Sequence, residues 1–131
     1  MSITVAVMSL RIAVLAHHSL FADGIASRLR EHSGQIEVQT VEAGAVDLPQ
    51  RLQRVRPAIV LMDSTDVEAV ERMPLDRLWA LLPEARVMRL DPASDHVRVF
   101  SCERWRAAGI EGLIAAMLKI GPAGWPPRPL A

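Results

Sequence analysis

Four side chains able to bind a metal ion or exchange a proton stand directly after apolar runs of this sequence. His17 and His18 follow the run RIAVLA, Asp63 follows AIVLM, and Asp91 follows ARVMRL. Imidazole and carboxylate together are ligands that zinc and nickel accept. If the runs are strands of a parallel sheet, these side chains meet at the carboxyl ends of the strands, where α/β domains bind small ligands.

Adjacent histidines after a strand usually point in opposite directions, so we expect at most one of His17 and His18 to face such a site. No glycine-rich phosphate loop follows the first run, and the sequence holds no nucleophile elbow and no motif with metal-ligand spacing. We therefore expect no enzymatic activity and no bound metal ion. A small α/β ligand-binding or metal-binding domain is the weaker alternative.

The composition narrows the class of protein. The 131 residues carry no formal net charge, which argues against a dedicated nucleic-acid binder. The single cysteine, Cys102, excludes an internal disulfide framework, and we interpret it as structural. No apolar stretch is long enough to cross a bilayer, and Arg11 interrupts the apolar N-terminus, so no signal peptide is expected. We expect one cytoplasmic domain that binds neither nucleic acid nor membrane.

The elements that must position these residues alternate between strand and helix. Apolar and β-branched runs predict strands over 11–16, 35–41, 58–62 and 85–90. Ser19 is a good helix N-cap and precedes an amphipathic segment over 20–32. Further helices are predicted over 48–55 and over 64–82, the latter interrupted at Pro74. This alternation predicts a parallel sheet covered by helices on both sides.

The alternation of predicted strands and helices ends after the fourth predicted strand. Residues 91–95 have turn composition, and apolar residues alternate with arginines over 97–99 and again over 104–107, which is typical of strands. We expect a β-hairpin here in place of a crossover helix, so that the last strand or strands run antiparallel at the edge of the sheet. A last amphipathic helix is predicted over 110–118.

The two ends of the chain differ from the middle. Residues 1–10 are interpreted as a leader or an extension of the first strand, and residues 11–120 as the domain. Residues 121–131 include four prolines, so we expect an extended or disordered tail.

The predicted hairpin also holds the candidate interface residues. Trp105 is flanked by Arg104 and Arg106, and a large aromatic side chain between arginines is typical of binding surfaces. Arg98 and Phe100 are the further candidates. A strand edge that is left open at this side of the sheet would accept a strand from a partner.

Three stretches resemble a bacterial response-regulator receiver domain of the class that precedes helix-turn-helix output domains. They are RIAVLAHHSLFADGIASRL, VEAG and LQRVRPAIVLMD, and the resemblance covers residues 11–90. It implies the flavodoxin-like receiver fold, a five-stranded sheet in the order 2-1-3-4-5 with strands one to four parallel. The predicted hairpin would replace the fourth helix of that family.

The receiver resemblance implies a site whose chemistry is lost. A receiver transfers a phosphoryl group to an aspartate with the help of magnesium, which is held by an acidic pair after the first strand. Asp63 stands at the acceptor position, but the acidic pair falls on Ala16 and His17. Asp91 replaces the hydroxyl residue of the family, and the family's lysine has no counterpart, since Lys119 lies in the last predicted helix. The resemblance therefore implies a pseudo-receiver that has lost magnesium binding.

These observations lead to one main functional hypothesis and its alternatives. The main hypothesis is a signal-transduction module that acts independently of phosphorylation by binding protein partners, forming a homodimer through residues 91–118. Asp63 would then be a cap that hydrogen-bonds loop amides, and the histidines would be polar residues that fill the former acidic pocket. The alternative is an atypical receiver that is still phosphorylated on Asp63.

Overall fold

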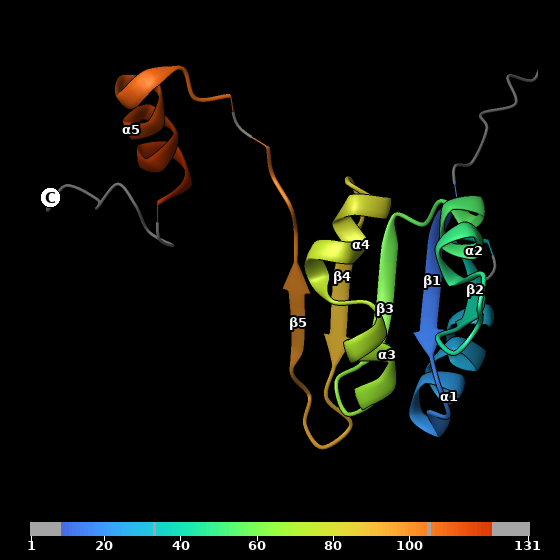
Figure 1. Cartoon of the computed structure of the whole chain (residues 1–131). Coiled ribbons are helices and arrows are strands. Elements are labelled where there is room, and N and C mark those ends of the chain that lie inside the picture. The colour runs from blue at the N-terminus through green and yellow to red at the C-terminus, as the bar shows by residue number, and fades with distance from the viewer. Residues whose placement is uncertain (1–8, 33, 105, 122–131) are drawn as a thin grey trace, which may run out of the picture.

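One five-stranded sheet organises the part of the chain that the structure describes. The computed structural model describes residues 9–32, 34–104 and 106–121, and its strands lie in the order β2-β1-β3-β4-β5 (Figure 1). The strands are β1 (Leu10–Ala16), β2 (Ile36–Glu42), β3 (Ile59–Asp63), β4 (Arg86–Leu90) and β5 (Val97–Phe100). The helices are α1 (Leu20–Arg30), α2 (Leu48–Val55), α3 (Val67–Arg72), α4 (Leu75–Leu81) and α5 (Gly109–Ile120).

The first four strands are parallel and the fifth is antiparallel, as the sequence predicted. β1 lies between β2 and β3, and β3 pairs with β4. β5 pairs antiparallel with β4, with Leu90 opposite Val97 and Val87 opposite Phe100. An antiparallel strand needs only a short connection, so residues 91–96 join the pair without a crossover helix.

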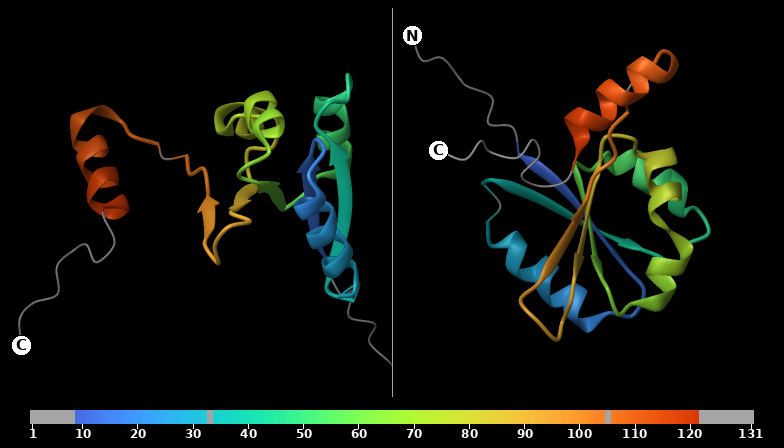
Figure 2. Two further views of the ribbon diagram at one scale, coloured as in Figure 1. Left: turned by 90° about the horizontal axis from the view of Figure 1, so that it is seen from below. Right: turned by 90° about the vertical axis from the view of Figure 1, so that its left-hand side faces the viewer.

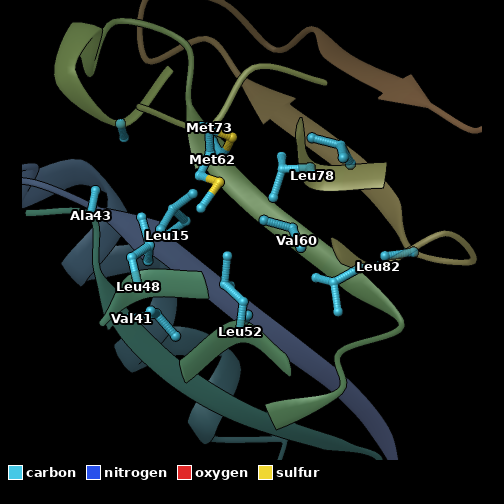
Figure 3. Close-up of a cluster of buried hydrophobic side chains, with 14 residues drawn as sticks. Leu15, Val41, Ala43, Leu48, Leu52, Val60, Met62, Met73, Leu78 and Leu82 are labelled. Atoms are coloured by element: carbon cyan, nitrogen blue, oxygen red, sulfur yellow. The ribbon is translucent and has the colours of Figure 1, made fainter. Parts of the chain in front are cut away.

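The larger core lies between one face of the sheet and helices α2, α3 and α4. Alternate residues of β1 and β3 point to this side, because successive side chains of a strand face opposite ways. Figure 3 shows them meeting leucines from α2 and α4. The side chains exposed by less than 2% include Leu15, Leu52, Val60, Met62, Met73 and Leu78.

Among the helices of the described residues, α1 is the one that covers the opposite face, over β1, β2 and β3. Ile12 and Val14 of β1 and Leu61 of β3 pack there against Ala22 and Ala26 of α1. Alanine at the two contact positions allows the helix to lie close to the strands. In the right-hand view of Figure 2, α1 lies on one side of the sheet and the helices α2 to α4 lie on the other.

Local signals place the start of α1 and the break between α3 and α4 where the sequence predicted them. The Ser19 hydroxyl accepts a hydrogen bond from the Ala22 amide at 3.0 Å and caps α1. The helical stretch after β3 is interrupted at Pro74, whose extended backbone separates α3 from α4.

The second half of the predicted hairpin does not form a strand. Residues 101–104 and 106–108 have no regular structure and run on from β5 to α5. No glycine or proline follows β5 to reverse the chain, so it continues past the end of β4. The prediction of a strand over 104–107 was therefore wrong for these residues, and Trp105, residues 1–8 and residues 122–131 lie outside the described residues.

Helix α5 lies away from the rest of the molecule. Figures 1 and 2 show it beyond the β5 edge of the sheet. None of its residues belongs to either buried cluster of the described chain. Within residues 9–32, 34–104 and 106–121, no helix is long and apolar enough to cross a membrane.

Candidate functional site

Asp63 ends β3 and has both carboxylate oxygens engaged by its own chain. Its Oδ2 accepts a hydrogen bond from the Ser19 hydroxyl at 2.7 Å. Its Oδ1 accepts from the amide of Thr65 at 2.8 Å and from the Thr65 hydroxyl at 2.7 Å. The carboxylate is 5% exposed and joins the end of β3 to the start of α1 and to the loop before α3. This is the arrangement that a structural cap requires.

These contacts decide the charge of Asp63. Burial raises the pKa of the carboxyl group, but the hydrogen bonds from Thr65 and Ser19 outweigh burial and hold the pKa below its usual value. Asp63 is therefore an anion at neutral pH whose charge is already stabilised by three protein donors.

His17 lies between carboxylates from two neighbouring elements. Its backbone amide donates to Asp66 Oδ2 at 2.8 Å. Its Nδ1 lies 2.8 Å from Glu42 Oε1, at the end of β2, and its Nε2 contacts the carboxylate of Glu68 in the first turn of α3. Carboxylate oxygens only accept hydrogen bonds, so both contacts are hydrogen bonds when each ring nitrogen carries a proton.

Glu42 is held in place from two sides. Its Oε1 also accepts a hydrogen bond from the Gly44 amide at 3.0 Å. This backbone donor, followed by the His17 side chain, holds the pKa of Glu42 below its usual value. A Cβ on Gly44 would lie 3.1 Å from His17 Nδ1, so glycine leaves the ring the space that it occupies.

His17 and His18 do not point in opposite directions, and that expectation was wrong. His18 has a left-handed backbone with a φ of 52°, which turns its side chain out of the alternation of an extended strand. The two ring centres lie 4.1 Å apart. Both histidines line one shallow hollow of about 330 Å³ together with Asp63, Thr65 and Glu68.

These residues do not fit the magnesium ion that a receiver would hold. Ala16 is buried in the sheet and offers no ligand, and His17 offers nitrogen, which magnesium does not favour. The imidazole also stands between Glu42 and Glu68 and keeps these carboxylates from sharing a cation. Among the described residues, no group of three His, Cys, Asp or Glu side chains is arranged to hold a metal ion.

Asp91 does not lie with the other three candidates. Of the four residues expected to cluster, His17, His18 and Asp63 share a hollow. Its Oδ1 accepts from the Ala93 amide at 2.9 Å and its Oδ2 from the Ser94 hydroxyl at 3.2 Å. An aspartate at the start of a turn forms these bonds readily, and they hold the side chain in the β4–β5 connection.

A second hollow, of about 520 Å³, lies beside that connection and is lined by two arginines. Arg89 of β4 and Arg98 of β5 stand directly opposite each other in the sheet. The guanidinium carbon of Arg89 lies 5.3 Å from the centre of the Phe100 ring, and its Nε is buried with no hydrogen-bond partner. Two like charges in a cross-strand pair destabilise the strand edge. Asp91 also lines this hollow, so the two arginines exceed its acidic groups by one charge, and the Arg89 Nε is left unsatisfied. We call this side of the hairpin the cationic face.

The other face of the hairpin is apolar. Leu90 packs against the α1 side of the sheet, and Met88 shares that side because it stands two residues away. Val97 and Val99 lie directly opposite Leu90 and Met88, and they are 46% and 59% exposed. We call Met88, Leu90, Val97 and Val99 the apolar band.

The sequence-based interface candidates within the described residues are divided between the cationic face and the linker. Arg98 and Phe100 lie on the cationic face, and Arg104 and Arg106 are exposed in the segment after β5. The sequence analysis missed Glu42, Asp66 and Glu68. Their positions in the sequence could have indicated them, because Glu42 ends the strand beside β1 and the other two begin the helix after β3.

The chain was compared with known proteins in three ways. No protein-family model matches it, and neither the curated proteins nor the solved structures gave a match. The proposed function therefore rests on the fold and on the two faces of the hairpin.

Proposed function

We propose that this chain is a receiver-like interaction module that binds protein partners independently of phosphorylation and forms a homodimer through residues 91–118. The observation that carries the proposal is where apolar surface is left open. Among the described residues, eight of the twelve exposed large apolar side chains lie in β5 and α5: Val97, Val99, Ile110, Leu113, Ile114, Met117, Leu118 and Ile120. Apolar surface gathered in one region is typical of an association site.

The receiver-like part of the proposal is supported by the strand order and by the sequence resemblance. The order β2-β1-β3-β4-β5, with β1 to β4 parallel, is the order that the flavodoxin-like receiver fold requires. Asp63 stands at the carboxyl end of the central strand β3, where a receiver carries its acceptor. The chain departs from that pattern in the antiparallel β5, which follows β4 without a crossover helix, and in residues 101–108 and α5.

Independence from phosphorylation is supported by the contacts of Asp63. A phosphoryl transfer would have to displace the donors on one of its oxygens, either Ser19 or both groups of Thr65. It would also proceed without the metal ion that neutralises the repulsion between a carboxylate and a phosphoryl donor.

Homodimer formation is supported by the state of α5. A helix of twelve residues is marginal on its own in water, because most helical stability comes from packing an apolar face. Its apolar side chains have no covering partner in the described chain. A second copy of the chain can bury these side chains against its own exposed apolar residues.

Intact-protein mass spectrometry after incubation with acetyl phosphate and magnesium tests the first half of the proposal. We expect no added phosphoryl group on the wild-type chain or on Asp63→Asn. An adduct on the wild type that is absent from Asp63→Asn would contradict independence and favour the atypical receiver.

Light scattering coupled to size exclusion tests the second half. We expect a dimer for the wild type and a monomer for Ile114→Glu, because a charge in the apolar face of α5 cannot be buried without a partner. Val46→Glu is the matched control: Val46 is fully exposed but lies outside β5 and α5, so this variant should remain a dimer. A wild type that is monomeric at high concentration would contradict dimer formation.

A further inference from the structure

The open side of α5 is a regular stripe. Ile110, Leu113, Ile114 and Met117 follow the spacing that places side chains on one face of a helix, and all four are exposed by 41% or more. Such a stripe is wide enough to pack on a sheet or on another helix. We call these four residues the α5 stripe.

The linker does not cover this stripe, because it packs on a different side of the helix. A Cβ on Gly112 would lie 3.3 Å from the backbone of Ala107, so the linker passes close to the helix at this point. Ala116 stands one turn further along and is the buried residue of α5. Gly112 and Ala116 are thus small residues on the side of the helix opposite the stripe, whose four side chains remain exposed.

The sheet carries a surface of matching chemistry. The apolar band of Met88, Leu90, Val97 and Val99 lies on the α1 side of the sheet, but α1 packs over β1, β2 and β3. Among the described residues, Leu90 packs at the edge of the cluster under α1, whereas Val97 and Val99 remain exposed. In the left-hand view of Figure 2, α5 lies beyond the β5 edge and no helix of the described chain lies over β4 and β5 on the α1 side.

We propose that the α5 stripe packs on the apolar band of a second copy, and that two copies exchange their α5 helices reciprocally. This inference rests on the proposed function as a dimerisation module and names the contact that would form the dimer. A reciprocal exchange about a two-fold axis makes the same contact twice and leaves neither stripe nor band open.

The course of the chain favours a second copy over the chain's own sheet. β5 runs antiparallel, so it delivers the chain to the end of the sheet where the other four strands begin (Figure 1). Residues 101–108 contain no glycine or proline for a tight return and span about 26 Å when fully extended. Residues 101–104 and 106–108 lead away from the sheet of their own chain, which is the geometry that helix exchange needs.

Disulfide cross-linking between two differently tagged chains tests the exchange. Cys102 is the only cysteine, so Cys102→Ser provides a background without thiols. One chain then carries Val99→Cys in the apolar band and the other carries Ile114→Cys in the α5 stripe. After mixing under mild oxidation, we expect a covalent heterodimer at the summed mass.

The matched control places the thiol on the opposite face of the same strand. Arg98 neighbours Val99 but lies on the cationic side, so Arg98→Cys with Ile114→Cys should give at least tenfold less heterodimer. A second pair, Val97→Cys with Met117→Cys, repeats the test if one variant fails to fold. Circular dichroism on each variant identifies such a failure.

Three results would overturn the exchange, and they separate it from the proposed function. A chain carrying both Val99→Cys and Ile114→Cys that cross-links within itself at monomer mass would place α5 on its own sheet. A wild-type dimer without the expected cross-links would place the dimer contact elsewhere and leave the proposed function intact. A wild-type monomer without cross-links between chains would overturn both.

Discussion

Two regions of the molecule differ in the groups that they leave without a partner. One is the carboxyl end of β3, and the other is the arm formed by β5, residues 101–108 and α5. At the first, Asp63 is buried and both of its oxygens accept hydrogen bonds from Ser19 and Thr65. In the arm, apolar side chains of the band and the stripe are exposed. A group whose contacts are complete has little left to offer a ligand, whereas uncovered apolar area gains free energy when it is buried.

The same contrast bears on the proposed receiver-like role. Asp63 stands where a receiver would be phosphorylated, yet its neighbours hold it as a cap. The surface that remains free for binding lies in the part of the chain where the receiver resemblance ends. Asp63 therefore lies in the region of the molecule that offers less free surface to a partner.

The largest expected effect compares a leucine of the closed region with one of the arm. Leu52 is 0% exposed and Leu113 is 41% exposed. We expect Leu52→Ala to lower the free energy of unfolding by about 2–5 kcal/mol, because it leaves a cavity in the larger core. Leu113→Ala should change the stability of the monomer by less than about 0.5 kcal/mol. Urea denaturation at low protein concentration measures both values, and equal losses would remove the distinction between the two regions.

The next effect concerns the carboxylate cap. Asp63→Asn replaces a charged acceptor by an amide whose NH₂ group would face donors, and we expect a loss of about 1–3 kcal/mol at neutral pH. Because the pKa of folded Asp63 is lowered, its ionised form stabilises the fold above the usual aspartate pKa of about 3.9. That stability is lost as the pH falls through the lowered pKa of the folded state.

The pH dependence is the sharper part of this test. The difference in unfolding free energy between wild type and Asp63→Asn should be constant above about pH 5 and shrink toward lower pH. Chemical denaturation at a series of pH values measures the difference. A gap that widens as the pH falls would mean that Asp63 is not stabilised as an anion.

The smallest effect is a gain in stability at the cationic face. Arg98 stands opposite Arg89, so Arg98→Glu replaces a repulsive cross-strand pair by an attractive one. We expect the free energy of unfolding to rise by about 0.2–1 kcal/mol, with a smaller gain at high salt. Arg104→Glu, in the exposed linker, serves as the control and should change little. A loss of stability in Arg98→Glu would indicate that the two arginines are held by a contact that the strand pairing does not reveal.

Most of the sheet could be predicted from the sequence, because each signal was local. The apolar runs marked the four parallel strands, Ser19 marked the start of α1, and Pro74 marked the break between α3 and α4. The turn composition of residues 91–95 and the alternation after it predicted the antiparallel β5.

What could not be predicted depends on tertiary contacts. Alternation over 104–107 is necessary for a strand, but nothing in that pattern supplies a neighbour to pair with. The left-handed backbone of His18 brings its ring to the same hollow as His17, and no rule of strand alternation foresees that. Asp91 was expected near Asp63 because it follows a predicted strand and stands at a position of the receiver pattern. In the structure, groups of its own turn hydrogen-bond its side chain instead.

The hairpin that joins β4 and β5 also sets an order of events during synthesis. β1 pairs with β3 only after α1, β2 and α2 have been made, whereas β4 and β5 are joined by residues 91–96 alone. A hairpin of this kind closes in about 1–10 μs, far faster than a ribosome adds the next residue. β4 and β5 leave the ribosome before α5 does, so the apolar band can form before the α5 stripe is free to pack on it.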